Sequence, residues 1–360
     1  KFETTSGGIT VTGAVNGIPF FSDAANNSMY THDVSATDST AANNTAYGFN
    51  ALDAITTGDN NTVIGAVSGG AMTTGSNNTA LGYQSGEDLV DGVQNTFVGA
   101  GAGKNMTAGD NNVAIGFEAL ATEDGNGRNI AIGVSALKLQ NAGAEAYNVA
   151  IGFTAGESIT LGIANTLIGG LAGDAINEGN QNVAIGHAAL STNQEGDSNV
   201  AIGFEALYTL NPANGNSYNT AVGTQAGKLM TTGVRNTIIG GLAGDALTTG
   251  NYNTAVGYAA LSQEDAHGTN VAMGYASLAT LNAGGDAFNT AVGYSAGGNM
   301  STAIRNTVIG GLAGDALTTG SYNVAIGYEA LSTEDTRSAN VAIGYQALKT
   351  QNAGADAYNT

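Results

Sequence analysis

Three histidines are the side chains that most readily suggest chemistry in this chain: His32, His187 and His267. Imidazole exchanges protons near neutral pH and ligates metals, so each could serve as a base or a metal ligand. His187 stands where neighbouring units of an internal repeat carry Tyr or Phe, so we expect a packed or rim aromatic there. His267 lies in an acidic turn with Glu264 and Asp265, where we expect a solvated side chain.

Other catalytic patterns are missing from the sequence. There is no pair of histidines at metal-binding spacing, no nucleophile elbow and no phosphate loop with its lysine. The chain has no Cys, which excludes a thiolate metal site, a cysteine nucleophile and a disulfide framework. A catalytic site would also have to interrupt the repeat to gather unlike residues, and no unit does so. We therefore expect a protein that is not an enzyme and has no cofactor.

Recurring carboxylates are the remaining candidates for a metal site. Asp174, Asp245 and Asp315 each end a Gly-Gly-Leu-Ala-Gly-Asp segment. Acidic turns recur too, at Glu123-Asp124, Glu195 with Asp197, Glu264-Asp265 and Glu334-Asp335. Calcium takes about six to eight oxygen ligands, so a single Asp per recurrence falls short. We expect these turns to be solvated and to bind no metal.

Composition and charge limit the partners. The 360 residues include 29 acidic and 9 basic ones, for a net charge of −20, and 55 are Gly. Such a surface repels nucleic-acid phosphates and anionic membranes, and no basic patch compensates for it. No apolar run approaches the roughly 18 residues that span a bilayer. We expect neither a nucleic acid nor a membrane as partner.

An internal repeat organises the chain. The pattern Asn-(Thr/Val)-x-(aliphatic)-Gly begins at Asn44, Asn61, Asn78, Asn95, Asn112, Asn129, Asn148, Asn165, Asn182, Asn199, Asn219, Asn236, Asn253, Asn270, Asn289, Asn306, Asn323, Asn340 and Asn359. The spacing is 17 residues except for 19 or 20 after every fourth unit, which gives a super-repeat of 70 or 71. The last unit is cut off at Thr360, so we expect the chain to come from a longer polypeptide.

The repeat predicts stacked strands. Seventeen residues are too few for a pair of helices, and a segment such as 340–345 is short, β-branched and closed by Gly. We therefore predict an all-β fold, a parallel β-solenoid (β-roll) of about 18 coils with 17-residue repeats, over residues 44–360. Residues 1–43 are predicted to be an N-terminal lead-in or capping segment. Within it we expect strands around 9–15 and 18–21, followed by a polar stretch from 23 to 43.

Three positions of the unit, counted from its Asn, have evident structural roles. Asn at position 1 can form hydrogen-bonded amide ladders between coils. Position 4 is apolar, and Gly at position 5 indicates a positive φ or a close backbone approach. These structural residues include Asn112, Asn148, Asn182, Asn253 and Asn323, Ile115, Ile151, Ile185 and Ile326, and Gly116, Gly152, Gly186, Gly257 and Gly327.

Residue sizes at other positions vary together. Position 3 is usually Ala and position 6 usually Tyr or Phe, but five units exchange the sizes: Val63/Ala66, Phe97/Ala100, Leu167/Gly170, Ile238/Gly241 and Val308/Gly311. Leu at position 9 accompanies a polar residue at position 12, as in Leu261 with Glu264, whereas Gly244 accompanies Leu247. We expect each pair of positions to share a close-packed interior.

Two surface features remain. Positions 3 and 4 point to opposite faces of a strand although both are apolar or small, so we expect several chains to associate, with three parallel copies preferred. The longer turns at 139–147, 210–218, 281–288 and 351–358 end in Tyr147, Tyr218, Phe288 and Tyr358. We expect these turns to bulge and their aromatic rings to cap a neighbouring coil rather than to contact a glycan.

The repeats resemble those of two families. Asn-Thr-Ala-Val-Gly-Tyr at 253–258 resembles the Asn-x-Ala-Ile-Gly coils of trimeric autotransporter adhesin heads. The units across 44–360 are even more similar to the Asn-Thr-Ala-Ile-Gly-Tyr-x-Ala-Leu repeats of phage tail fibres, and residues 1–13 resemble a Glu-Thr-Thr stretch of phage fibre and tail proteins. The resemblance implies a homotrimeric rod in the virion, the shaft of a phage tail or capsid fibre. It would present a host-recognition tip, with other fibre or tail proteins as partners and a host glycan or protein bound through other regions.

Two other functions stay open. The first is the head or stalk of a bacterial surface adhesin, located outside the cell or on its surface. A downstream coiled coil and membrane anchor would favour it, and an upstream tail-attachment domain would favour the phage fibre. The second is an ice-binding solenoid, which needs a flat, regular array of Thr. Position 2 instead alternates irregularly between Thr and Val or Ile, as in Thr96, Val113 and Ile130.

Overall fold

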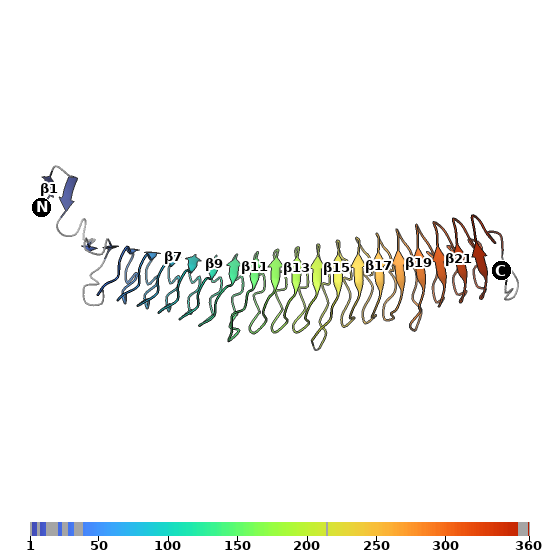
Figure 1. Cartoon of the computed structure of the whole chain (residues 1–360), viewed down its shortest axis with the longest axis horizontal. Coiled ribbons are helices and arrows are strands. Elements are labelled where there is room, and N and C mark those ends of the chain that lie inside the picture. Colours follow the sequence, from blue (N-terminus) through green and yellow to red (C-terminus); the bar gives the residue numbers. More distant parts are fainter. Residues whose placement is uncertain are drawn as a thin grey trace. The chain divides into compact units, whose positions relative to one another are not determined.

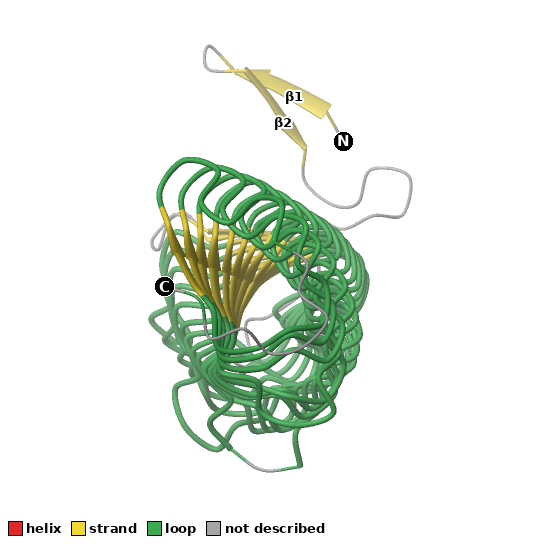
Figure 2. Ribbon diagram, turned by 90° about the vertical axis from the view of Figure 1, so that its right-hand side faces the viewer, coloured by secondary structure: helices red, strands yellow, loops and turns green. Residues whose placement is uncertain are grey.

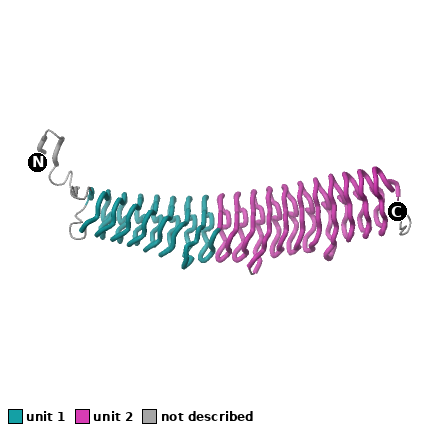
Figure 3. The backbone as a smooth tube through the Cα atoms, in the orientation of Figure 1, with its two compact units in different colours: residues 1–164 teal, residues 165–360 magenta. Residues whose placement is uncertain are grey.

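The computed structural model describes residues 2–5, 8–11, 21–23, 28–31, 39–213, 215–351 and 359. The chain forms two compact units, Lys1–Ala164 and Asn165–Thr360, which Figure 3 colours separately. Short strands and turns alternate along both units, and the described residues contain no helix (Figure 2).

The first unit contains strands β1 to β11. Strands β1 (Phe2–Thr5) and β2 (Gly8–Val11) form an antiparallel hairpin. Strand β3 (Phe21–Asp23) is antiparallel to β4 (Ser28–Tyr30), and from β4 onward neighbouring strands are parallel. The parallel strands that follow are β5 (Thr45–Tyr47), β6 (Thr62–Ile64), β7 (Thr79–Leu81), β8 (Thr96–Val98), β9 (Val113–Ile115), β10 (Ile130–Ile132) and β11 (Val149–Ile151).

The second unit contains only parallel strands, in chain order (Figure 1). They are β12 (Thr166–Ile168), β13 (Val183–Ile185), β14 (Val200–Ile202), β15 (Thr220–Val222), β16 (Thr237–Ile239), β17 (Thr254–Val256), β18 (Val271–Met273), β19 (Thr290–Val292), β20 (Thr307–Ile309), β21 (Val324–Ile326) and β22 (Val341–Ile343). The fold is thus an all-β parallel solenoid with a 17-residue repeat, as the sequence predicts. Nineteen described strands, β4 to β22, are parallel.

The beginning of the chain differs from the prediction in part. The described part of the strand expected at 9–15 falls in β2, and residues 12–20 lie outside the described residues. The stretch from 23 to 43, which was expected to be polar, contains β4, whose Met29 pairs with Thr45. The side chains of Ser28 and Tyr30 are buried while Met29 is 45 % exposed. This period-2 pattern suits a strand, so stacking begins before residue 44.

Hydrogen bonds between coils continue beyond the strands. The backbone N–H of Leu120 donates to the Ala136 carbonyl at 3.0 Å, and that of Thr231 donates to the Thr248 carbonyl at 2.8 Å. Both bonds lie in turns, yet they join equivalent or adjacent positions of successive coils. The backbone is therefore satisfied by neighbouring coils around much of each turn, as burial of polar groups requires.

Each three-residue strand turns its middle residue inward. Ala114 at position 3 is fully buried, whereas Ile115 at position 4 is 36 % exposed. The same alternation appears with large side chains, because Ile238 is fully buried and Ile239 is 40 % exposed. Positions 3 and 4 therefore lie on opposite faces of the sheet, as expected from strand periodicity.

Tight corners rely on left-handed backbone conformations. Gly257 at position 5 has φ +134°, and a Cβ there would lie 2.4 Å from the Gly274 carbonyl oxygen of the next coil. Only Gly fits both conditions. Positions 7, 9 and 17 also have positive φ, mostly with non-glycine residues, such as Glu118 (+52°), Leu120 (+51°) and Asn111 (+59°). Such residues are unfavourable singly, so the inter-coil contacts must hold them in place.

The prediction that positions 3 and 6 exchange size because both lie in the interior is wrong. The interior holds Val63, Phe97, Leu167, Ile238 and Val308, but the large residues at position 6 face outward, for example Tyr83 at 56 % exposure. Inside, large side chains at position 3 face Gly at position 9: a Cβ on Gly103 would lie 2.6 Å from the Phe97 ring. Outside, a Cβ on Gly241 would stand 3.5 Å from Tyr258, which is an ordinary contact, and Tyr258 and Tyr275 stack at position 6 of successive coils. A ring at position 6 therefore does not require a small residue in the neighbouring coil.

The predicted exchange between positions 9 and 12 holds in some coils only. Leu247 is fully buried, and a Cβ on Gly244 would lie 2.8 Å from Leu247 Cδ1. In another coil, however, Leu207 at position 9 and Leu210 at position 12 are both fully buried. Both positions therefore face the interior, but a large residue at one does not exclude a large residue at the other.

Candidate functional site: an apolar outer face and buried acidic turns

The asparagines at position 1 form the internal frame of each unit. Asn253 is buried, and its backbone N–H donates to Asn236 Oδ1 at 2.8 Å. Its own Oδ1 accepts the backbone N–H of Asn270 at 3.1 Å. Equivalent bonds from the Asn of one coil to the Asn of the next involve Asn112, Asn148, Asn182 and Asn323. The side-chain amide also donates to a turn carbonyl 14 residues further on, as in Asn182 to Gly196 at 2.8 Å. These residues therefore hold coils in register rather than meeting a ligand.

The representative glycines and isoleucines have different surroundings. Positive φ values occur at Gly116, Gly152, Gly186, Gly257 and Gly327, between +134° and +146°. Ile151, Ile185 and Ile326 are half-buried on the outward side of their strands, where Ile115 also lies. The glycines shape the corner, and the isoleucines form part of an exposed surface.

We call the exposed apolar side chains at positions 4 and 6 the outer face. In the first unit its members are Tyr47, Phe49, Ile64, Leu81, Tyr83, Ile115, Phe117, Val134 and Phe153, each exposed by 36 % or more. In the second unit they are Ile168, Phe204, Ile239, Tyr258, Met273, Tyr275, Tyr294, Ile309, Tyr328, Ile343 and Tyr345. Extended apolar patches of this kind are rare on monomers and mark interaction surfaces.

Aromatic rings of the outer face stack from coil to coil. Tyr275 lies between Tyr258 and Tyr294, with ring centroids 5.6 and 5.2 Å apart and nearly parallel planes. His187 stacks on Phe204 at 5.7 Å. His187 is thus an aromatic member of this row, as predicted, while His32 lies outside the described residues. Stacking fixes the ring orientation and gives the face a regular surface.

The aromatics that end the three longer turns at 139–147, 210–218 and 281–288 remain about half exposed. These three turns extend beyond their neighbours in Figure 1, but Tyr147 is 52 %, Tyr218 51 % and Phe288 52 % exposed, so the expected capping does not bury the rings. Tyr147 instead contacts Arg128, whose guanidinium lies 5.5 Å from the ring centre. The same pairing joins Arg235 to Tyr252 at 5.6 Å, in coils without a long turn. The turn at 351–358 has only residue 351 among the described residues.

The expectation of solvated acidic turns is wrong for three glutamates. Glu123, Glu264 and Glu334 at position 12 are fully buried. Each accepts a hydrogen bond from the backbone N–H three residues on, at 3.2 Å for Asn126 and 3.1 Å for Arg337. Position 12 faces the interior, and a glutamate can be buried there because its carboxyl group closes its own turn with a hydrogen bond. The apolar residues at position 12 of other coils, such as Leu247 and Leu317, were the available signal.

Burial changes the protonation of these carboxyl groups. It raises the pKa of Glu123 above its ordinary value of 4.5, against the opposing hydrogen bonds from Asn126. Burial likewise raises the pKa of Glu264, against hydrogen bonds from His267 and Ala283. One oxygen of each carboxyl, Oε2, has no hydrogen-bond partner among the described residues. Unpaired buried oxygens favour the neutral form.

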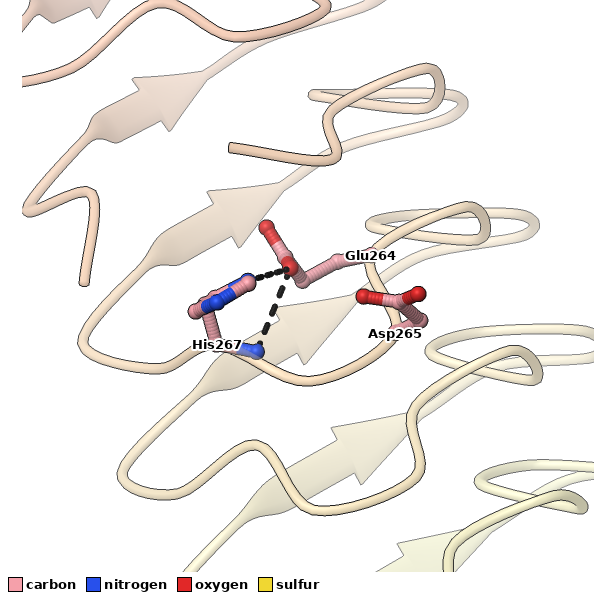
Figure 4. A group of neighbouring side chains, drawn as sticks. All are labelled: Glu264, Asp265 and His267. Atoms are coloured by element: carbon pink, nitrogen blue, oxygen red, sulfur yellow. Dashed lines mark hydrogen bonds and ion pairs between the residues drawn. The ribbon is translucent and has the colours of Figure 1, made fainter. Parts of the chain in front are cut away.

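One acidic turn also contains a histidine. Glu264, Asp265 and His267 each place a ligand-type atom within 4.8 Å of the other two. Figure 4 shows the Glu264 carboxyl group next to the His267 ring, with Asp265 on the opposite side. His267 Nδ1 lies 3.4 Å from Glu264 Oε1, and the His267 backbone N–H donates to the same oxygen at 3.3 Å. Among the described residues, no other such group of three His, Cys, Asp or Glu side chains occurs.

The recurring aspartates do not gather into a site. Asp174 accepts a hydrogen bond from Ser191 at 2.5 Å, whereas Oδ1 of Asp245 and of Asp315 is buried without a hydrogen-bond partner among the described residues. Burial raises the pKa of Asp245 and of Asp315. They are separate, partly buried carboxyls, one in each super-repeat.

Comparisons with known proteins give no further information on the site. No family model, curated protein or solved structure matches this chain. Across the described residues, no helix has the length and apolar character needed to cross a membrane.

Proposed function

We propose that this chain is a structural segment of a homotrimeric fibre, the shaft of a phage tail or capsid fibre. In this role it has no enzymatic activity and sets a host-recognition tip, carried by another region, away from the particle. The outer face is the observation that carries the proposal. Copies packed side by side bury it, which removes the apolar side chains from water.

Physical features of each unit support this role. The interior of each coil is filled by the side chains at positions 3, 9 and 12. The apolar side chains at positions 4 and 6 point outward, so their own coil leaves much of their surface exposed. Burial of apolar surface contributes about 25 cal/mol per Å², and repetition over many coils multiplies that gain. The net charge of −20 keeps the remaining surface soluble. The assignment to phage rather than to a bacterial adhesin rests on the resemblance of the repeats and of residues 1–13.

The solution mass tests self-association directly. Light scattering on this chain is expected to give about three times the 35.6 kDa of one copy. A mass of one copy would contradict the proposal. If such a monomer also produced thermal hysteresis in freezing solutions, the ice-binding alternative would gain support, because Thr at position 2 lies on the outward side of the strands.

A matched pair of substitutions in β16 separates association from folding. Ile239→Asp changes an outward side chain that is 40 % exposed, and Ile238→Asp changes a fully buried one. Ile239→Asp is expected to weaken association while leaving the circular dichroism spectrum of the folded chain unchanged. Ile238→Asp is expected to disrupt folding, because an unpaired carboxylate would be buried. An Ile239→Asp variant as fully associated as the wild type would contradict the role of the outer face.

The coding sequence on either side of this chain tests its origin. A tail-attachment domain encoded upstream supports the phage fibre. A coiled coil and membrane anchor encoded downstream would instead assign the chain to a bacterial surface adhesin.

A further inference from the structure

The turn at 264–267 brings together three side chains that are suited to a transition metal. Nδ1 of His267, a carboxylate oxygen of Asp265 and one of Glu264 lie within 4.8 Å of one another. Two ligands of a tetrahedral zinc ion, each about 2.1 Å from it, stand about 3.4 Å apart. The Nδ1 to Oε1 distance is 3.4 Å, so two of the three atoms already have this spacing.

The cluster also contains atoms that could ligate a metal and whose hydrogen bonding is incomplete. Glu264 is fully buried, and Figure 4 shows its carboxyl group directed toward the His267 ring. Glu264 Oε2 has no hydrogen-bond partner among the described residues, and His267 Nδ1 has none besides its contact with Glu264 Oε1 at 3.4 Å. A buried carboxylate without a compensating charge is costly. A divalent cation bound here would supply that charge and would occupy the lone pair of Nδ1.

Equivalent turns of other super-repeats show what is special about this one. Position 15 is Asn126 after Glu123-Asp124, Arg337 after Glu334-Asp335, and Gly196 after Asn193-Gln194. Glu123 and Glu334 are as fully buried as Glu264. Only the turn at 264–267 adds an imidazole, so the chain provides its own control turns.

We propose that Glu264, Asp265 and His267 bind one Zn²⁺ per chain. An imidazole nitrogen with two carboxylates suits zinc, whereas calcium prefers about six to eight oxygen ligands and does not select imidazole. Water completes the coordination. The ion ties positions 12, 13 and 15 of one turn together and neutralises the buried Glu264. This inference does not depend on the fibre proposal, since the three residues belong to one coil.

Isothermal titration of the metal-free 360-residue chain with zinc chloride at neutral pH tests the site. We expect one bound Zn²⁺ per chain and no binding of Ca²⁺ in a parallel titration. His267→Asn should abolish zinc binding while the circular dichroism spectrum stays unchanged, because Asn already occupies this position at Asn126. His32→Asn and His187→Asn should retain it. Absence of zinc binding by the wild type, or its persistence in His267→Asn, would overturn the proposal.

A gain-of-function variant makes the test sharper. Asn126→His places an imidazole after Glu123 and Asp124, in a turn with the same buried glutamate. The expected result is two Zn²⁺ ions per chain. If the variant folds like the wild type but binds no second ion, these three residue types in this turn are not sufficient, and the proposal is wrong in its central claim.

Discussion

Two adjacent coils of the first unit solve the same packing problem in different ways. The coil at 95–111 fills its interior with Phe97, Gly103 and Met106 at positions 3, 9 and 12. The coil at 112–128 uses Ala114, Leu120 and Glu123 at the same positions. All five side chains larger than Gly are fully buried, and Phe97 pairs directly with Ala114 across β8 and β9.

The comparison shows that the side chains at positions 3, 9 and 12 together fill one interior volume. A large ring at position 3 and an apolar residue at position 12 leave room for no more than Gly at position 9. Ala at position 3 and Leu at position 9 leave room at position 12 for a polar group that closes the turn or for an apolar residue, as Leu210 shows in the coil of Ala201 and Leu207. Position 12 faces the interior in every such coil, so a carboxyl placed there is buried.

Removal of the ring from the first coil should have the largest effect. Phe97→Ala leaves a cavity in a fully buried site, and we expect a loss of about 3–5 kcal/mol in the free energy of unfolding. Denaturant unfolding of the folded chain measures this. The outward Phe117→Ala is the control, with a much smaller loss expected in the unassociated chain. Equal losses in the two variants would contradict the inward and outward assignment.

Filling position 9 of the same coil should have the next largest effect. Gly103→Leu would clash with Phe97, since even a Cβ would lie 2.6 Å from the ring. We expect a loss of about 1–3 kcal/mol from overpacking. The double variant Phe97→Ala with Gly103→Leu reproduces the neighbouring coil at these positions and should recover most of the stability. Its backbone conformation is accessible, because Leu120 has φ +51°. Additive losses in the double variant would argue against a shared volume.

The buried carboxyl of the second coil should make stability depend on pH. Because burial raises the pKa of Glu123 above 4.5, the folded chain binds more protons than the unfolded one between 4.5 and the raised value. The stabilising contribution is complete below pH 4.5 and is lost as pH rises through the folded pKa, with a slope of at most about 1.4 kcal/mol per pH unit.

Glu123→Gln tests this dependence through the difference between variant and wild type. The variant should gain in stability relative to the wild type as the pH rises from 4 to 8, as measured by melting temperature at each pH. The difference isolates Glu123, because the other carboxyls with shifted pKa values, such as Glu264 and Asp245, are present in both chains and their contributions cancel. A difference that does not change with pH would show that Glu123 titrates normally when folded.

The smallest effect is expected at the corners of the two coils. Position 17 is Asn111 in one and Arg128 in the other, and Arg128 forms an ion pair with Glu145 and contacts Tyr147. Arg128→Asn should lower the melting temperature by less than any change above, because the pair is exposed to solvent and screened by salt. The difference from wild type should disappear in high salt. A large, salt-independent loss would indicate a buried role for this arginine.

Part of the fold could be predicted from the sequence of the repeats. Asn at 17-residue spacing predicts stacked coils, and the ladder through Asn253 has the expected hydrogen bonds. The exchange between positions 9 and 12 correctly places both inside. The exchange between positions 3 and 6 was misleading, because position 3 faces the interior and position 6 faces outward, so their side chains do not share a volume. Inside, Phe97 instead excludes a side chain at Gly103.

The candidate sites were harder to foresee. His187 was correctly placed as a rim aromatic, but Glu264 was expected in water and lies fully inside. Charge alone predicts exposure, whereas the apolar residues at position 12 of other coils, such as Leu247 and Leu317, indicate that this position faces the interior. The contact of His267 Nδ1 with Glu264 Oε1 depends on a tight turn that local sequence does not specify.

The sequence by itself determined the period, the parallel stacking, the Asn ladder and the Gly corner. These follow from local rules, since identical residues at a fixed spacing align only if the coils stack. The tertiary structure decided which way position 6 faces, how positions 7, 9 and 17 adopt positive φ, and which carboxyls are buried. The physical reason is that these properties depend on the volume and hydrogen bonds supplied by neighbouring coils, and a single repeat does not contain that information.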